Sequence, residues 1–175
     1  ISDLNIEETE MEIQNIKKQL SYEKEFSKNV KTVKTKYRLF IEQTISRCFN
    51  TKTINEIYNR IDPHPKQKLV QFIPELNDGT KLRVKTGDKD GFYDDPTLYN
   101  SSGQISILSL SIFLAKALQT RDELDTIFMD DPIQYLDSIN VLSFIDLLRT
   151  IITKEKRQLV ISTHDNNFYQ LLQKK

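Results

Sequence analysis

The stretch DTIFMDDPIQYLD, residues 125–137, decides the fold of this chain. A short apolar run ends there in two adjacent aspartates, Asp130 and Asp131, and a proline follows them. A buried strand needs no carboxylates at its end, and neighbouring negative charges repel each other. The pattern therefore predicts a strand end that holds a hydrated divalent cation beside a phosphate. A solvated turn is the alternative, which the apolar run and the later Asp137 disfavour.

Strands and helices alternate around this stretch. The pattern predicts strands at 124–129 and 157–163, and helices at 101–118, at 138–152 and from about 166 onward. Such alternation with short links is typical of the α/β class, with a parallel sheet and flanking helices. Parallel crossovers are right-handed, which places both strand ends at one edge, where α/β proteins bind ligands. We therefore expect Asp130, Asp131 and His164 at the same edge.

The region before it, residues 50–100, predicts a linker helix and a β-hairpin. A short helix at 50–61 is ended by DPHP. Strands at 68–76 and 80–86 are joined through NDG, which is a strong hairpin signal. The Asp- and Gly-rich residues 87–96 predict a loop.

The first 49 residues predict a coiled-coil helix, because residues 3–49 contain no Gly or Pro and their apolar residues recur at spacings of three and four. The phase of this pattern slips between Leu20 and Phe26, as in a stammer. Such a helix would be about 70 Å long. The chain offers no second long heptad stretch and starts inside the helical pattern without Met. We expect the partner helix to come from elsewhere, and the chain to be a fragment of a longer polypeptide.

The composition narrows the class of partners. The 25 acidic and 25 basic residues cancel, so nucleic-acid contact would need a local basic patch. No run approaches the ~18 apolar residues of a membrane span, and no signal peptide opens the chain, so we expect no membrane contact. The lone Cys48 is expected to be a small buried hydrophobe, and it fits a reducing, cytoplasmic location.

Two further segments offer groups that bind anions. NSSGQ, residues 100–104, combines hydroxyls, backbone N–H groups and the positive end of a helix, although a plain helix cap explains it equally well. STHD, residues 162–165, follows the second strand, and its His164 could donate a hydrogen bond to a phosphate oxygen. Asp165 or Asn166 could cap the last helix.

Together these segments resemble the motifs of ATP-binding-cassette (ABC) ATPases. NSSGQ is similar to the signature motif LSGGQ, from which Asn100 and Ser102 depart. TIFMDD resembles the Walker B strand of P-loop ATPases, QYLD the D-loop and STHD the switch histidine, in the family's order over roughly residues 95–175. The heptad helix before them narrows the resemblance to the C-terminal half of a head domain in the SMC-like branch, of the SbcC type used in DNA repair. Residues 101–175 would then form the C-terminal lobe of an ABC head.

The resemblance implies a role for each residue of the strand ends. Asp130 would position Mg²⁺ through water, and His164 would contact the γ-phosphate of ATP. Asp131 stands where the family usually has a catalytic Glu and is one methylene shorter. A misplacement of about 1 Å can cost on the order of 100-fold in rate, so the resemblance implies slow hydrolysis unless the backbone compensates.

The resemblance also implies a dimer of heads held together by ATP. Ser101 and Gly103 would reach the γ-phosphate of ATP bound by a second head, and Asp137 would lie at the same seam. The implied ATP-binding residues of this chain are Ser101, Ser102, Gly103, Gln104 and Asp137. DNA and a nuclease are further partners that such heads imply, in repair, chromosome organisation or defence.

One part of an ATPase is missing from these residues. No GxxxxGK[ST] occurs, because none of the four glycines is followed by Lys. The phosphate loop would therefore lie on an N-terminal half of the same head, and this chain alone should neither bind ATP well nor hydrolyse it.

Basic residues on the long helix give weak local support for DNA binding. Lys17, Lys24, Lys31 and Arg38 recur every seven residues, and Lys28 and Lys34 lie nearby. Such a stripe could contact DNA phosphates without reading bases, but an ordinary solvated face with Glu–Lys pairs explains it equally well. Two other functions stay open. One is a structural coiled-coil module whose decayed head binds nucleotide without turnover, and the other is a metal-dependent nuclease that uses Asp130 and Asp131 directly.

Overall fold

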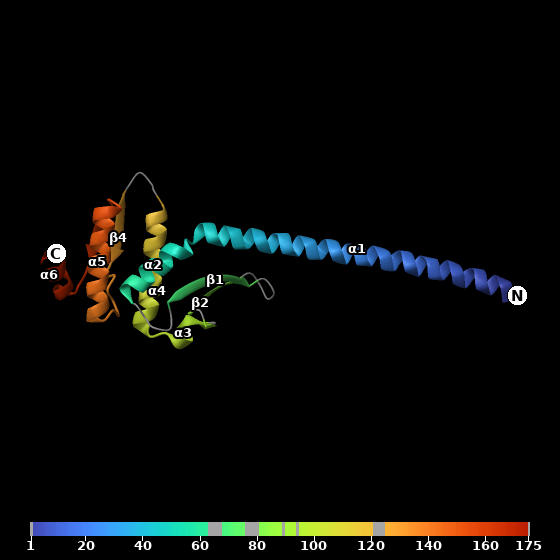
Figure 1. Cartoon of the computed structure of the whole chain (residues 1–175), viewed down its shortest axis with the longest axis horizontal. Helices are drawn as coiled ribbons and strands as arrows, with labels where there is room; N and C mark the ends of the chain where they lie inside the picture. Colours follow the sequence, from blue (N-terminus) through green and yellow to red (C-terminus); the bar gives the residue numbers. More distant parts are fainter. Residues whose placement is uncertain are drawn as a thin grey trace. The chain divides into compact units, whose positions relative to one another are not determined.

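The computed structural model describes residues 2–62, 68–75, 81–88, 90–93, 95–120 and 125–174, with side chains from residue 9 onward except at 93 (Figure 1). Its contacts divide the chain into two compact units, residues 1–43 and 44–175. The expected hairpin turn at 77–79 and part of the expected loop at 87–96 lie outside the described residues.

The predicted long helix is confirmed as α1 (Ser2–Cys48), which continues without a break through the expected phase slip (Figure 1). From Met11 to Phe40 its apolar side chains are exposed, as a helix that lacks its partner requires. The expectation that Cys48 is buried is wrong, since this thiol is exposed. Cys48 ends α1, and the next residue takes the inward position instead: the ring of Phe49 stacks on Phe72 with centroids 4.6 Å apart.

The region after α1 contains the predicted helix and hairpin. Helix α2 (Thr51–Ile61) buries one face, and strands β1 (Leu69–Glu75) and β2 (Lys81–Gly87) are antiparallel. The side chain of Asn55 fixes α2 to β1, because it accepts from the N–H of Val70 and donates to its carbonyl, at 2.7 and 3.3 Å.

The expected loop at 87–96 contains more structure than the sequence predicted. A turn in which Oδ1 of Asp88 accepts from the N–H groups of Asp90 and Gly91 reverses the chain. The two-residue strand β3 (Phe92–Tyr93) can therefore pair with β2, and the short helix α3 (Pro96–Tyr99) follows.

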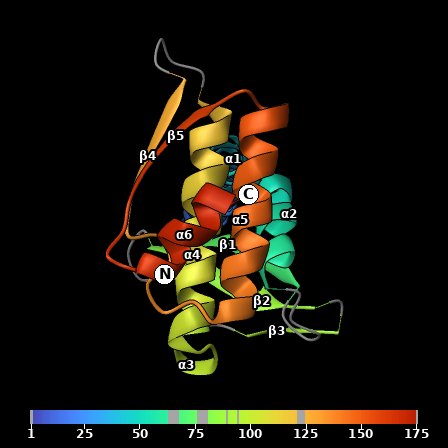
Figure 2. The same cartoon turned by 90° about the vertical axis from the view of Figure 1, so that its left-hand side faces the viewer.

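The predicted α/β alternation is confirmed in the second half of the chain. It comprises α4 (Ser102–Gln119), β4 (Thr126–Asp130), α5 (Ser138–Lys154), β5 (Gln158–Ser162) and α6 (Asn166–Lys174). Strands β4 and β5 are parallel, in a register that places Asp130 beside Ser162. Figure 2 shows that the carboxyl ends of both strands and the amino ends of α4 and α5 lie toward the same end of the unit.

The core of this unit lies between the helices and one face of β4–β5. Helix α2 packs against α4 and α5, and the side chains of Ile127 and Met129 are buried on the same side. The opposite face of the two strands is open, since Phe128 is 65% and Val160 is 50% exposed. Parallel sheets are normally covered on both faces, so this apolar face requires a cover that the described residues do not supply.

Candidate functional site

The two aspartates that end β4 both bond to the end of β5. Oδ1 of the exposed Asp130 accepts a hydrogen bond from the hydroxyl of Ser162, its neighbour in the strand register. The backbone N–H of Asp131 donates to the carbonyl of Ser162 at 2.8 Å. The aspartates therefore have fixed places at the strand ends instead of belonging to a solvated turn.

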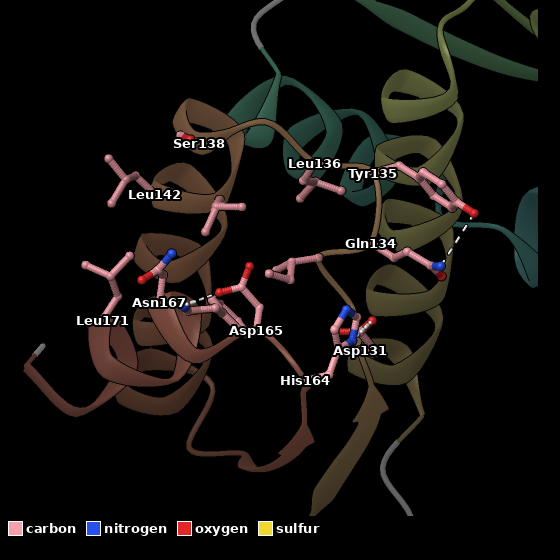
Figure 3. A pocket seen from close by; sticks show the side chains of 13 residues that line it. Asp131, Gln134, Tyr135, Leu136, Ser138, Leu142, His164, Asp165, Asn167 and Leu171 are labelled. Carbon is pink, nitrogen blue, oxygen red and sulfur yellow. Dashed lines mark hydrogen bonds and ion pairs between the residues drawn. The ribbon is translucent and has the colours of Figure 1, made fainter.

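Each carboxylate oxygen of Asp131 has its own partner on β5 or just beyond it. Oδ1 accepts from the hydroxyl of Thr163 at 3.1 Å, and Oδ2 lies 2.7 Å from Nδ1 of His164. Figure 3 shows Asp131 and His164 side by side at the edge of a pocket. The carboxylate is 21% exposed and the imidazole 81%, so the pair presents the histidine to solvent and holds the acid behind it.

The backbone of Asp131 is also unusual. Its φ is 44°, in the left-handed region that Asp and Asn adopt more readily than most residues. This conformation turns the chain sharply where β4 ends, so the carboxylate folds back toward β5. The residue that departs from the expected Glu therefore sits on a backbone that suits an aspartate.

A pocket of about 570 Å³ opens beside this pair, between the turn after β4 and helices α5 and α6 (Figure 3). Its polar end contains Asp131, His164 and Asp165, and Leu142 and Leu171 form part of its apolar end. Of the two expected caps of α6, the structure selects Asp165, whose Oδ1 accepts from the N–H of Phe168 at 2.9 Å. The pocket can thus receive a group that is polar on one side and apolar on the other.

The signature-like segment forms the start of α4. The hydroxyl of Ser101 accepts from the N–H of Gln104 at 3.2 Å, and the Gln104 side chain accepts from the N–H of Ser101 at 2.9 Å. This reciprocal capping box caps the amino end of α4, and the exposed Ser102 is the first residue of the helix. A Cβ added at Gly103 would lie only 2.8 Å from the carbonyl oxygen of Tyr135. Glycine is therefore required where α4 touches the D-loop-like segment.

Asp137 caps α5, because its side chain accepts from the N–H of Asn140 at 2.8 Å. The structure thus gives Asp137 and Ser101 structural roles at the two helix starts that lie toward the same end of the unit (Figure 2). A cap and a ligand contact are compatible at such positions, since helix starts attract anions.

The predicted site residues fall into two groups. Asp130, Asp131 and His164 come together as expected, whereas no hydrogen bond or ion pair among the described residues joins the segment 101–104 to them. Ser162 and Thr163 had no predicted role, although hydroxyl residues at the end of one strand opposite acids on the next were a usable signal. The side chains that the structure describes include no cluster of three His, Cys, Asp or Glu able to hold a metal.

No protein-family model and no curated protein matches this sequence. Solved structures do match its fold. One, from a study of ATP-driven dimerisation and DNA-stimulated activation of SMC ATPases, aligns with a TM-score of 0.53 and 15% identity over 73% of this chain and 75% of that chain. An Smc head bound to the C-terminal winged-helix domain of ScpA aligns at 0.55 and 16%, over 74% of this chain and 39% of that chain.

The Smc head domain of Pyrococcus yayanosii with a coiled coil and joint aligns over 91% of this chain but only 30% of that chain, at a TM-score of 0.53 and 15% identity. The match to a head with its coiled coil fits the order of the elements, a long helix followed by the α/β unit. Within the described residues, no helix has both the length and the apolar character that a membrane span needs. This chain therefore has the fold of the C-terminal lobe of an SMC head domain, preceded by a coiled-coil helix.

Proposed function

We propose that this chain is the C-terminal half of an SMC-like head that binds and hydrolyses ATP at an interface between two heads, coupled to DNA binding or processing. The observation that carries the proposal is the pairing of Asp131 with His164 beside Asp130, at the ends of two parallel strands in an SMC-head fold. In this function Asp131 accepts a proton from, or orients, the attacking water. The imidazole donates to Asp131 through Nδ1, and in its doubly protonated form it would also donate from Nε2 to a γ-phosphate oxygen.

Asp130 suits a shared Mg²⁺ site. Mg²⁺ keeps most of its waters and takes one or two carboxylates together with phosphate oxygens. Asp130 offers an exposed carboxylate with one oxygen already oriented by Ser162, which fits a ligand that acts through water. Bound Mg²⁺ would neutralise part of the phosphate charge. Because the described residues contain no complete metal cluster, the remaining ligands would be waters and the nucleotide.

The proposal assigns the phosphate loop to an N-terminal half of the same head. The sequence of this chain has no such loop, and one face of β4–β5 is apolar and uncovered. The N-terminal half would cover Phe128 and Val160 and extend the sheet. In this division residues 1–49 are the coiled-coil helix, 50–100 the linker helix and hairpin, and 101–175 the lobe that carries the motifs.

A second head would meet the start of α4. Ser101, Ser102, Gly103 and Gln104 lie at the amino end of an 18-residue helix, where backbone N–H groups favour a phosphate. In a site shared between two heads, the segment 101–104 of each head would serve the nucleotide of the other head. Asp137, at the start of α5, would lie at the same seam.

The test is ATP turnover and dimerisation of the full-length protein, with and without DNA, for wild type, Asp131→Asn and Ser101→Arg. The proposal expects turnover by wild type and loss of turnover in both variants. Asp131→Asn should accumulate an ATP-bound dimer, whereas Ser101→Arg should fail to dimerise because the arginine side chain blocks the helix start. Dimers that form equally well with Ser101→Arg would contradict the assigned interface.

A nucleotide-gated clamp without turnover is the second candidate, and one observation favours it. Asp131 is a shorter acid than the family's Glu, and both of its oxygens are already held by Thr163 and His164. Wild type that dimerises with ATP yet never hydrolyses it would establish the clamp.

DNA contact is proposed for α1. None of the stripe lysines Lys17, Lys24, Lys28, Lys31 and Lys34 has an ion pair among the described side chains, although Arg38 pairs with Glu42 at 3.1 Å. Lys24, Lys28 and Lys31 line one hollow with hydroxyl residues. DNA-stimulated activation, a property of the SMC ATPases named above, agrees with such contacts. We place the protein in the cytoplasm, with a nuclease as a further partner.

Charge reversal of Lys24, Lys28 and Lys31 tests the stripe. Binding to phosphates should weaken uniformly across sequences, and the slope of affinity against salt should fall by about one for each contact that is lost. If the affinity for DNA is unchanged, these lysines form an ordinary solvated helix face and do not contact DNA.

A further inference from the structure

The ends of β4 and β5 form a matched set of four residues. In the parallel register Asp130 lies beside Ser162, and the next residues, Asp131 and Thr163, are joined by a hydrogen bond. Each hydroxyl donates to the acid beside it, Ser162 to Asp130 and Thr163 to Asp131. Two adjacent carboxylates that would otherwise repel and reorient each other thus have separate donors at and just beyond the end of the next strand.

Thr163 is unusually well fixed for this task. Its hydroxyl oxygen accepts from the N–H of Asp165 at 3.1 Å, so the single O–H hydrogen is directed to Oδ1 of Asp131. The side chain is half-buried, and β-branching restricts its χ1 angle. The turn before α6 therefore orients the Thr163 hydroxyl, and this hydroxyl in turn orients the carboxylate of Asp131.

We propose that Thr163 is a positioning residue, which holds the carboxylate of Asp131 in the orientation that meets the attacking water. The proposal deepens the proposed function and rests on it. With Thr163 on one oxygen and His164 on the other, the carboxylate plane is fixed, and each oxygen keeps a further lone pair for water. An aspartate reaches less far than a glutamate, so its orientation matters more to the reaction.

Two variants of the full-length protein separate this role from a merely structural one. Thr163→Val keeps the shape and the β-branch but removes the hydroxyl, whereas Thr163→Ser keeps the hydroxyl. We expect kcat for ATP to fall by roughly 10- to 100-fold in Thr163→Val, with KM changed by less than about 3-fold. Thr163→Ser should recover kcat to within about 3-fold of wild type.

A double variant tests whether Thr163 acts through Asp131. In single-turnover measurements on Asp131→Asn, adding Thr163→Val should change the residual rate by less than about 2-fold, because the carboxylate to be positioned is gone. Unfolding temperatures of all the variants identify any loss that comes from misfolding.

Three results would overturn the inference: equal kcat for wild type and Thr163→Val, a Thr163→Ser variant as slow as Thr163→Val, or a change in KM alone. Those results leave ATP hydrolysis intact. A wild-type protein without any turnover is distinguishable from them, because it removes the proposed hydrolysis and this inference with it.

Discussion

Helices α1 and α5 carry apolar residues at the same spacings, yet they end in opposite environments. In α5 the side chains of Phe144, Ile145, Leu147, Leu148 and Ile151 are buried. In α1, by contrast, Phe26, Val33 and Phe40 are 63%, 65% and 63% exposed. Such a periodic pattern therefore indicates a helix face that packs on a partner. Among the described residues the apolar face of α5 has this packing, whereas these three side chains of α1 do not.

The strand pair β4–β5 has one apolar face that is buried and one that is exposed. Its inner face packs on the core, and its outer face exposes Phe128 and Val160. The polar ends of the two strands, in contrast, are well partnered within the chain, because Asp130 has a donor on β5 and Asp131 has one directly after it. The polar strand ends are thus already organised within the chain. The exposed apolar faces of β4–β5 and α1, in contrast, lack a partner among the described residues.

The largest expected effect is a difference in protein stability between matched substitutions in α5 and α1. Phe144 is fully buried and stacks on Phe168 with ring centroids 6.3 Å apart. Phe144→Ala should lower the free energy of unfolding by about 3–5 kcal/mol, because it leaves a cavity. The matched Phe26→Ala in α1 should change it by less than about 0.5 kcal/mol. Urea unfolding of both variants measures the difference, and a similar cost in each would mean that α1 packs within this chain.

An intermediate effect is expected for the pH dependence of stability, which involves Tyr58 in α2 and is compared with Tyr37 in α1. Burial, and secondly the charge of Asp62, raises the pKa of Tyr58 to about 12, whereas Tyr37 in α1 is half-exposed. The folded pKa of Tyr58 exceeds the unfolded value near 10, so its stabilisation is complete below about pH 10 and is lost as the pH rises toward 12. Between about pH 9 and 11 the loss should be on the order of 1 kcal/mol.

Tyr58→Phe should remove this pH dependence, and Tyr37→Phe is the matched variant at an exposed position. At about pH 9, Tyr58→Phe should be nearly neutral, because the Tyr58 hydroxyl has no hydrogen-bond partner among the described residues. Urea unfolding at the two pH values tests this. A wild-type curve with the same pH dependence as Tyr58→Phe would contradict the buried-tyrosine account.

The smallest expected effect separates the two roles of Ser101. Ser101→Ala removes the α4 cap and should cost about 1 kcal/mol of stability. Ser101→Asp keeps a capping oxygen, so it should retain stability, but it places a negative charge where the proposed phosphate approaches. Thermal unfolding together with ATP-dependent dimerisation measures both properties. If Ser101→Asp dimerises like wild type, this serine is a cap and nothing more.

Much of the architecture follows from local pattern. The long helix, the hairpin strands and the alternating second half were predictable, because their apolar patterns are pronounced and because α1, β4, α5 and β5 contain no Gly or Pro. The meeting of Asp130, Asp131 and His164 was predictable for the same reason, since parallel strands with a right-handed crossover end at one edge.

What the sequence could not supply depends on register and on contacts between distant segments. The bond from Thr163 to Asp131 joins residues 32 positions apart and exists only in one alignment of β4 and β5. The need for glycine at position 103 comes from the carbonyl of Tyr135, which no local pattern indicates. Strand β3 depends on its pairing with β2, and two residues are too short to produce a pattern.

The most direct test of the central claim, that this chain is one half of a nucleotide site, is equilibrium binding of Mg-ATP. It should be measured for this chain alone and for this chain mixed with the separately produced N-terminal half that carries the phosphate loop. We expect no appreciable binding by this chain alone, and a complex of the two halves that binds Mg-ATP and loses ATP-dependent dimerisation with Ser101→Arg. Tight Mg-ATP binding by this chain alone, or halves that do not associate, would contradict the account.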